Sequence, residues 1–376
     1  MKRFGYLILG VAVGIIVVIT AQVLYKRYKV ANRITLDKIQ NAYALTEPPK
    51  YDNNELSKVD SYSEYKNSSN KPVLKIRVIN HWDKNTKPED IRLPIIHDIL
   101  AEKYTLEYSK DHYDILITSH FKYDDVPLKK DNIVSIYYTG EAYVGDPKPY
   151  LDKVDLAMGF DYIDRPNYIR FPISYYSVSH LYDVTNMRHD YTRSKKCEPA
   201  KKPYFACFLA SNHGDWFPEI SDGVIARDRI FSKLSLYKKV MSGGKHLNNI
   251  GGAVPREETM KWLSQCKFVI SYENTFNYPG YITEKPYLGW FAGSVPIYNA
   301  HKTVLGDLNT KAILYAGDFA TEDDFVEYIK KIDNDDKLYC DIWDEQIITD
   351  PSKDYLELKN QVRTKLNELI AKKIGK

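Results

Sequence analysis

Acidic, amide, hydroxyl and lysine side chains crowd one short segment of the chain, residues 271–299. The apolar run 266–272 predicts a buried strand, and residues 281–292 predict the helix that follows it. In open α/β sheets, ligands bind at the edge where the strands end. We therefore expect a site for a nucleotide-sugar at this edge. Its candidate residues are Glu273, Asn274, Thr275, Tyr281, Thr283, Glu284 and Lys285.

Two adjacent charged residues, Glu284 and Lys285, could bind the ribose and the diphosphate of such a ligand. A carboxylate can accept hydrogen bonds from both hydroxyls of a ribose, and a lysine can neutralise charge that develops on a diphosphate. Residue type alone leaves an alternative open, in which Glu284 is an acid at a helix start and Lys285 is a surface lysine.

Another carboxylate follows a predicted strand in the first half of the chain. Residues 133–138 are hydrophobic and lead into Thr139, Gly140 and Glu141. A sugar hydroxyl becomes a good nucleophile when a carboxylate takes its proton, an effect of about 10²- to 10⁴-fold. Glu141 is therefore a candidate general base, and a glutamate that only hydrogen-bonds a loop is the alternative.

Two further segments carry groups that suit phosphate. Residues 226–239 predict a helix bearing Arg227, whose planar guanidinium can bind phosphate oxygens bidentately; a solvent-facing arginine is the alternative. Residues 242–252 form a glycine-rich loop with Lys245 and Asn249, and glycines let backbone N–H groups approach phosphate. The loop has neither the P-loop nor the GxGxxG spacing, so by itself it is weak evidence.

These motifs together resemble those of the family 10 fucosyltransferases. The resemblance rests on residues 272–275 (YENT), 281–285 (YITEK), 293–297 (GSVPI) and 138–141 (YTGE), and it continues through the block 154–172. The chain departs from the family pattern at three positions. Gly280 precedes Tyr281, Pro286 follows Lys285, and Ile230 replaces an aromatic residue, which leaves Arg229 as an alternative to Arg227.

The resemblance implies a role for each candidate residue. Glu141 would be the general base, Arg227 and Lys285 would hold the diphosphate, Glu284 would bind the ribose, and Tyr281 would form the pocket wall. The other expected donor-binding residues are Lys245, Asn249, Glu273, Asn274 and Thr283.

The activity implied is that of an inverting transferase that moves L-fucose from GDP-fucose to a glycan hydroxyl. The acceptor would be a glycan, glycoprotein or glycolipid that contains GlcNAc, and the linkage would be α1,3. No Asp-x-Asp follows a strand of the second half, so no metal or other cofactor is expected, and cationic side chains would stabilise the departing GDP. The alternatives are a transferase that uses another GDP-sugar and a catalytically silent glycan- or nucleotide-binding protein.

Alternating apolar and amphipathic runs predict an α/β protein with a GT-B-like arrangement, two Rossmann-like domains with a cleft between them. The expected parts are an N-terminal membrane anchor (1–30), a stem (31–71), an acceptor-side domain (72–195), a GDP-fucose-binding domain (203–350) and a C-terminal amphipathic helix (351–376). The polar stretch 192–203 separates the two domains.

The N-terminus predicts attachment to a lipid bilayer. Residues 4–25 carry no charge and are long enough to cross a hydrocarbon core of about 30 Å, so an anchor is favoured over a cleaved signal peptide. Charges flank both ends of the run and do not decide its orientation. The family layout implies a single-pass type II protein of the Golgi membrane in a eukaryotic source.

Composition limits the remaining possibilities. The net charge is only +3 with 27% charged residues, so no nucleic-acid partner is expected. The four cysteines lack the spacing of a zinc site. One or two disulfides are possible, although Cys207 and Cys266 lie in apolar runs where reduced core cysteines are the usual case.

Overall fold

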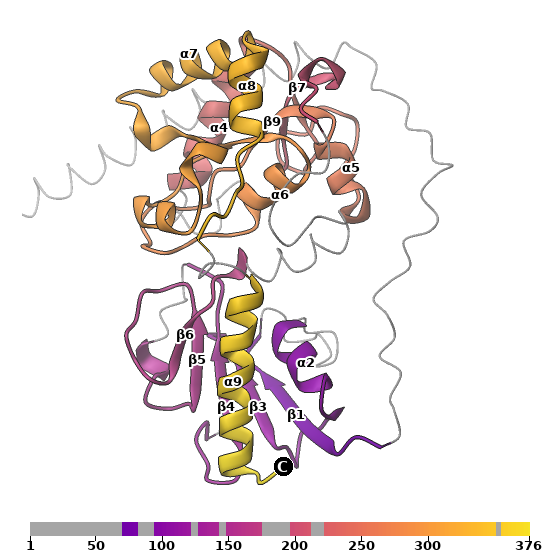
Figure 1. Cartoon of the computed structure of the whole chain (residues 1–376), viewed down its shortest axis with the longest axis vertical. Helices are drawn as coiled ribbons and strands as arrows, with labels where there is room; N and C mark the ends of the chain where they lie inside the picture. Colours follow the sequence, from indigo (N-terminus) through magenta and orange to yellow (C-terminus); the bar gives the residue numbers. More distant parts are fainter. Residues whose placement is uncertain are drawn as a thin grey trace, which may run out of the picture.

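The computed structural model describes residues 70–81, 94–121, 127–142, 148–174, 196–211, 222–350 and 355–376. The structure contains two sheets of parallel strands, one from each half of the chain. They follow one another along the long axis of the molecule (Figure 1). The anchor expected in residues 1–30 lies outside the described residues, as does the expected stem apart from residues 70 and 71. Among the helices of the described part, none combines the length and the apolarity that crossing a membrane requires.

The first sheet consists of six described parallel strands in the order β2-β1-β3-β4-β5-β6. The strands β3 and β4 are buried along their whole length, which agrees with their mostly apolar sequences. The bounds are β1 (Val73–Ile79), β2 (Thr105–Tyr108), β3 (Ile115–Thr118), β4 (Val134–Tyr138), β5 (Leu156–Gly159) and β6 (Tyr168–Arg170).

The second sheet has five described parallel strands in the order β11-β10-β9-β7-β8. Counted along the chain, its order is 2-1-3-4-5, which is also how the first sheet begins. Both units are therefore doubly wound and Rossmann-like, as the sequence predicted. The bounds are β7 (Tyr204–Phe208), β8 (Val240–Ser242), β9 (Cys266–Ile270), β10 (Val295–Tyr298) and β11 (Leu314–Tyr315).

This strand order fixes where each unit can bind a ligand. In doubly wound sheets the crevice opens where the winding reverses direction, beyond the ends of the first and third strands. That point lies between β1 and β3 in the first sheet and between β7 and β9 in the second.

Helices of the second unit cover its sheet and carry recognisable end signals. Thr321 caps α7, since its hydroxyl accepts from the N–H of Asp324, and three acidic residues occupy the first turn. The helix expected at 281–292 begins four residues later, because Pro286 occupies its first turn. The described helices are α2 (Pro94–Ala101), α4 (Asp222–Ser235), α5 (Thr259–Leu263), α6 (Lys285–Phe291), α7 (Glu322–Asp333), α8 (Asp336–Trp343) and α9 (Tyr355–Lys373).

The closing helix α9 packs on the first sheet although it follows the second unit in the chain (Figure 1). Its apolar residues Leu358, Val362, Leu366 and Ile370 join the core that contains β1, β3 and β4. At its end, Lys373 forms an ion pair with Asp155 at 2.8 Å. The first unit is thus completed by residues from the far end of the chain.

All four cysteines form disulfides, which corrects one expectation. Cys207 of β7 is bonded to Cys266 of β9, where reduced core cysteines were expected, and Cys197 is bonded to Cys340 of α8. The two buried apolar strands bring their cysteines together, a proximity that the apolar pattern of each strand did not indicate.

A buried ion pair joins the two units. Arg170, at the end of β6, donates to both carboxylate oxygens of Asp307 at 2.8 and 2.7 Å. The side chain of Asp307 is 1% exposed and that of Arg170 is 16% exposed. Arg170 also donates to the carbonyl of Phe160 in its own unit and to that of Gly280 in the other unit.

Candidate functional site

The loop that follows β9 holds a carboxylate with no exposed surface, Glu273. One of its oxygens accepts from the Thr283 N–H at 2.8 Å and from the Tyr298 hydroxyl at 3.2 Å. The other accepts from the Thr283 hydroxyl at 2.7 Å and from the Lys285 ammonium at 3.2 Å. Glu273 therefore orients Lys285 from a buried position, and its expected contact with a ligand stays a prediction.

Electrostatics keep Lys285 charged. Burial lowers the pKa of Lys285, but the carboxylates of Glu273 and Glu284 outweigh burial and hold that pKa above its ordinary value. Burial raises the pKa of Glu273, an effect opposed by the facing Lys285 and by the bonds from Thr283. Glu284 is the more exposed carboxylate, with 36% of its side chain exposed, and lies 3.9 Å from the Lys285 ammonium. Glu284 and Lys285 are thus available at the edge of the second sheet.

The helix α4 brings a second cation to this edge. Arg227 is 5% exposed and donates to the side-chain oxygen of Asn274 at 3.1 Å. Its approach depends on Gly223 at the start of α4, where an added Cβ would lie 2.2 Å from the Glu273 carbonyl oxygen. Burial lowers the pKa of Arg227, while Asp228, Glu273 and Tyr281 oppose that shift. Arg227 also lowers the pKa of Lys285, so the two cations lie within electrostatic range of each other.

Arg229, the alternative left open by the sequence, points elsewhere. It donates to both carboxylate oxygens of Glu322 at 2.6 to 3.1 Å and so ties α4 to α7. Its side chain is 43% exposed. Of the two arginines, the structure therefore brings only Arg227 to the site.

Tyr281 lies at the contact between the two units, and its expected part in a pocket wall stays a prediction. Its ring packs edge to face against Phe160 from the first unit, with centroids 5.3 Å apart. Burial raises the pKa of its hydroxyl well above the ordinary value, and Glu273, Glu141 and Glu284 add to that shift. The contribution of Glu141 places this carboxylate of the first unit within electrostatic range of the second unit's site.

The glycine-rich loop after β8 is held by its own side chains. Asn249 donates to the Val240 carbonyl at 2.8 Å and accepts from the Ser242 N–H at 2.8 Å, so its amide supports β8. His246 contacts Asp228 of α4 at 2.9 Å. Lys245 is exposed on the loop. The contacts expected between this loop and a ligand stay predictions.

Glu141 lies just beyond the end of β4, as the sequence predicted. Its N–H donates to the Thr139 hydroxyl at 3.2 Å, and Thr139 itself is fully buried. An added Cβ at Gly140 would lie 2.7 Å from the Cβ of Ile173, so the turn between them is closely packed. The turn sets the direction in which Glu141 leaves the sheet.

Sequence reasoning missed a polar group at the same edge of the first sheet. Four residues follow β1 and β3, namely Asn80, His81, Ser119 and His120. His81 is 3% exposed and His120 is 8% exposed. The signal was present, because both pairs directly follow apolar runs that predict strands, but histidine and serine match no motif there.

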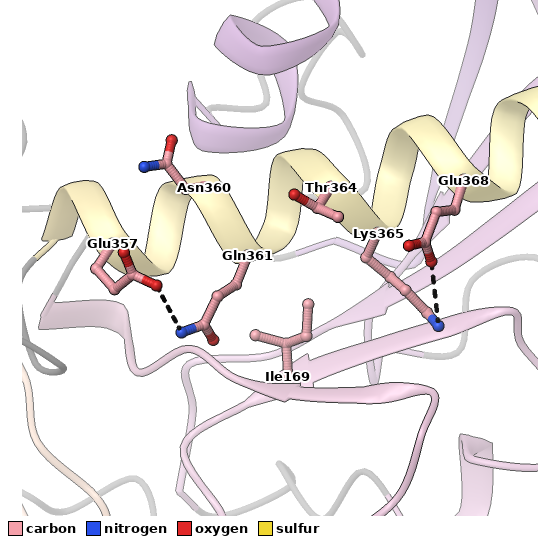
Figure 2. Close-up of a pocket in the computed structure, with 7 residues that line it drawn as sticks. All are labelled: Ile169, Glu357, Asn360, Gln361, Thr364, Lys365 and Glu368. Carbon is pink, nitrogen blue, oxygen red and sulfur yellow. Dashed lines mark hydrogen bonds and ion pairs between the residues drawn. The ribbon is translucent and has the colours of Figure 1, made fainter.

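A surface cavity of about 340 Å³ lies away from this group, between α9 and β6. Figure 2 shows that its polar side chains come from α9 and that two pairs of them interact, Gln361 with Glu357 by a hydrogen bond and Lys365 with Glu368 as an ion pair. No candidate residue from the sequence lines it, and we assign it no part in the chemistry. Among the described residues, no three His, Cys, Asp or Glu side chains are grouped so as to hold a metal ion.

Comparison with protein families gives two matches. Residues 199–359 match the family described as glycosyltransferase family 10 (fucosyltransferase), C-terminal part. Residues 76–178 match the N-terminal domain of alpha-(1,3)-fucosyltransferase FucT. Together the matches span both sheets and every candidate site residue.

Individual relatives align with parts of the chain. The alpha-(1,3)-fucosyltransferase FucT of Helicobacter pylori is 27% identical over 298 residues, which are 73% of this chain and 60% of that protein. A putative fucosyltransferase of Acanthamoeba polyphaga mimivirus is 38% identical over 139 residues, 34% of this chain and 23% of that protein. The chain thus aligns with less than two thirds of the length of these relatives.

Solved structures agree on the fold. A crystal structure of an alpha1,3-fucosyltransferase superposes with a TM-score of 0.63 at 24% identity, covering 82% of this chain and 93% of that chain. A crystal structure of an alpha1,3-fucosyltransferase with GDP-fucose gives a TM-score of 0.59 at 24% identity, covering 86% of this chain and 95% of that chain. The two-sheet arrangement is therefore a GT-B fold.

Proposed function

The chain belongs to glycosyltransferase family 10, the fucosyltransferases, and from that premise we propose that it transfers L-fucose from GDP-fucose to a hydroxyl of a GlcNAc-containing glycan, with α1,3 linkage. One observation carries the proposal. Two cations, Arg227 and Lys285, converge where the second sheet reverses its winding, and a carboxylate of the first unit, Glu141, lies within electrostatic range of the same site. A diphosphate donor and a hydroxyl acceptor need these groups.

The donor is proposed to bind at the edge of the second sheet. Lys285 presents its ammonium at the start of α6, held by Glu273 and Thr283, and Arg227 reaches the same edge from α4. Glu284, which is partly exposed beside them, is suited to accept from the ribose hydroxyls. The similar crystal structure of an alpha1,3-fucosyltransferase with GDP-fucose supports this choice of donor.

In the proposed reaction, the acceptor oxygen attacks the anomeric carbon of fucose opposite the leaving phosphate. The new bond joins the acceptor oxygen to that carbon, and the bond from carbon to the phosphate oxygen breaks. The hydroxyl proton passes to the carboxylate of Glu141, and GDP leaves with the bonding electron pair. Because the attack is in line, the anomeric configuration is inverted.

Negative charge grows on the diphosphate as GDP leaves. Positive groups that are already in place stabilise such charge without reorganisation, especially where water is partly excluded. Arg227 and Lys285 would supply this stabilisation from their fixed positions, so we propose that the reaction proceeds without a metal ion.

We also propose that residues 4–25 anchor the protein in a bilayer, in the Golgi membrane of a eukaryotic source. The run is uncharged and apolar, and the two disulfides are typical of a catalytic part in an oxidising compartment. Extraction of membranes with alkaline carbonate should leave the full chain in the pellet and release a variant lacking residues 1–30. Release of the full chain would contradict the anchor.

The activity is tested by incubating the purified full-length chain with labelled GDP-fucose and a panel of GlcNAc-containing acceptors in excess EDTA. We expect a labelled product with inverted configuration, and we expect Glu141→Gln to lose transfer while it still binds GDP. Product with retained configuration would overturn the mechanism. GDP binding without transfer to any acceptor would favour a silent binding protein, and transfer from a different GDP-sugar alone would change the donor.

A further inference from the structure

A buried polar group lies where the first sheet reverses its winding. The loop after β1 carries His81 and the loop after β3 carries Ser119 and His120, at the position equivalent to the donor edge of the second sheet. The two imidazoles are close enough for His120 to lower the pKa of His81. None of these residues has a part in the mechanism proposed above, although their loops adjoin that of Glu141.

Two short contacts connect this group to Glu141. The Nδ1 atom of His120 lies 2.9 Å from the hydroxyl oxygen of Thr139. The same hydroxyl oxygen accepts the N–H of Glu141 at 3.2 Å. The Ser119 hydroxyl lies 3.2 Å from the same Nδ1. One hydroxyl therefore links the ring of His120 to the backbone of the general base.

The protonation state of His120 suits a hydrogen-bond acceptor. Burial lowers the pKa of His120 to about 4, so the ring is neutral at physiological pH. A neutral ring accepts at one nitrogen and donates at the other. With Nδ1 as the acceptor, the Thr139 proton points to the ring, and the Thr139 lone pairs remain available to the Glu141 N–H.

We propose that His120 is a positioning residue for transfer, which acts through Thr139 to fix the direction in which Glu141 faces the acceptor; this inference rests on the function proposed above. The carboxylate must reach the proton of the acceptor hydroxyl while the oxygen of that hydroxyl faces the anomeric carbon of fucose. A carboxylate displaced by about 1 Å loses on the order of 100-fold in rate, because the reacting groups no longer align. Donor binding, which belongs to the second unit, is unaffected.

Thr139→Val provides the main test, since valine keeps the shape of threonine and removes the hydroxyl. We expect its kcat for fucose transfer to fall about 10- to 100-fold, with the KM for GDP-fucose and the Kd for GDP unchanged. Thr139→Ser keeps the hydroxyl and should retain kcat within about threefold. The melting temperature of each variant separates this effect from a loss of folding.

Variants of His120 test the other end of the link. His120→Asn places an amide oxygen near the position of Nδ1 and should restore much of the kcat that His120→Leu loses. Both residues act along one link, so their effects should not add. The kcat of the double variant His120→Leu with Thr139→Val should therefore lie within about twofold of the kcat of the slower single variant.

The outcomes distinguish this inference from the function on which it rests. A wild-type chain that transfers no fucose would overturn the function and the inference with it. An active wild type in which Thr139→Val keeps its kcat would overturn the positioning role alone. Equal losses in Thr139→Ser and Thr139→Val, or effects of His120→Leu and Thr139→Val that add, would overturn it as well.

Discussion

Surroundings decide what a carboxylate does in this site. Glu273 has no exposed surface and accepts from four donors, whereas Glu284 is partly exposed and lies 3.9 Å from its nearest cation. A buried carboxylate with its oxygens occupied is a fixed part of the scaffold. A partly exposed one remains available to a ligand, so we expect the two glutamates to contribute in different ways to the proposed donor site.

The arginines of α4 provide a matched pair at the residue scale. We expect Arg227→Ala to weaken GDP binding at least about 10-fold, because a charge-assisted contact to phosphate is among the stronger hydrogen bonds. Arg229→Ala should leave GDP binding unchanged and cost about 0–1 kcal/mol of stability, the usual value for an exposed ion pair. Calorimetric titration with GDP measures the first effect and urea unfolding the second. Weaker GDP binding in Arg229→Ala alone would reverse the assignment.

The lowered pKa of His81 leads to a prediction of how the free energy of unfolding depends on pH. An unfolded histidine titrates near 6.5, whereas burial, aided by repulsion from His120, lowers the pKa of folded His81 to about 3. Below pH 6.5 the unfolded chain therefore binds a proton that the folded chain excludes. The stabilisation is complete above that pH and is lost toward pH 3, with a slope of up to about 1.4 kcal/mol per pH unit.

Unfolding in urea at pH 7 and at pH 5 measures this loss. The carboxylates of the chain also titrate on the acid side, so His81→Asn serves as the control. We expect the free energy of unfolding to fall more between the two pH values in the wild type than in the variant. Equal losses would show that His81 makes no contribution.

At the scale of elements, the sequence predicted most strands and helices, and it missed contacts between distant segments. The strand–loop–helix order around Glu284 and Lys285 was correct, since apolar runs and a following amphipathic run are local signals. The start of α6 was placed too early, because Gly280 adopts a positive φ of 82° and Pro286 fixes the first turn. The burial of Glu273 and the pairing of Cys207 with Cys266 depend on neighbouring strands, which no local pattern reports.

Helix α9 shows the same limit and gives a prediction. Its amphipathic pattern was visible in the sequence, but its partner sheet was not. Leu366 is fully buried in the core of the first unit, whereas Thr364, on the same helix, is exposed. We expect Leu366→Ala to cost about 2–5 kcal/mol of stability and Thr364→Ala to stay within about 0.5 kcal/mol. Thermal or urea unfolding of the two variants measures the difference, and equal costs would contradict the packing of α9.

At the scale of the whole molecule, the two units share one strand order and present corresponding edges to one another. The second unit places Arg227 and Lys285 at its edge, and the first places Thr139 and Glu141 at its own. The two cations and the proposed general base thus come from different units. The distance between them therefore depends on the contacts that join the units, chiefly the ion pair of Arg170 with Asp307 and the packing of Phe160 on Tyr281.

The Arg170–Asp307 pair can be compared with an ion pair of similar geometry at the surface. Arg363 of α9 donates to both carboxylate oxygens of Glu102 at 2.7 and 2.9 Å, and the two side chains are 30% and 41% exposed. Removing one partner of a buried pair leaves an uncompensated charge and costs about 3–5 kcal/mol, whereas an exposed pair contributes about 0–1 kcal/mol. We therefore expect Arg170→Met to lower the free energy of unfolding by several times more than Arg363→Met does.

Arg170→Met should also affect transfer, because Arg170 donates to the Gly280 carbonyl, next to Tyr281. Gly280 is held at a close approach, since an added Cβ there would lie 2.4 Å from the Phe160 carbonyl oxygen. Loss of the ion pair removes one of the contacts that hold the edge that carries Glu141 relative to the edge that carries Lys285. Assayed at a temperature where the variant is folded, Arg170→Met should lose kcat while Arg363→Met keeps it, and an unchanged kcat would show that the substrates themselves align the two units.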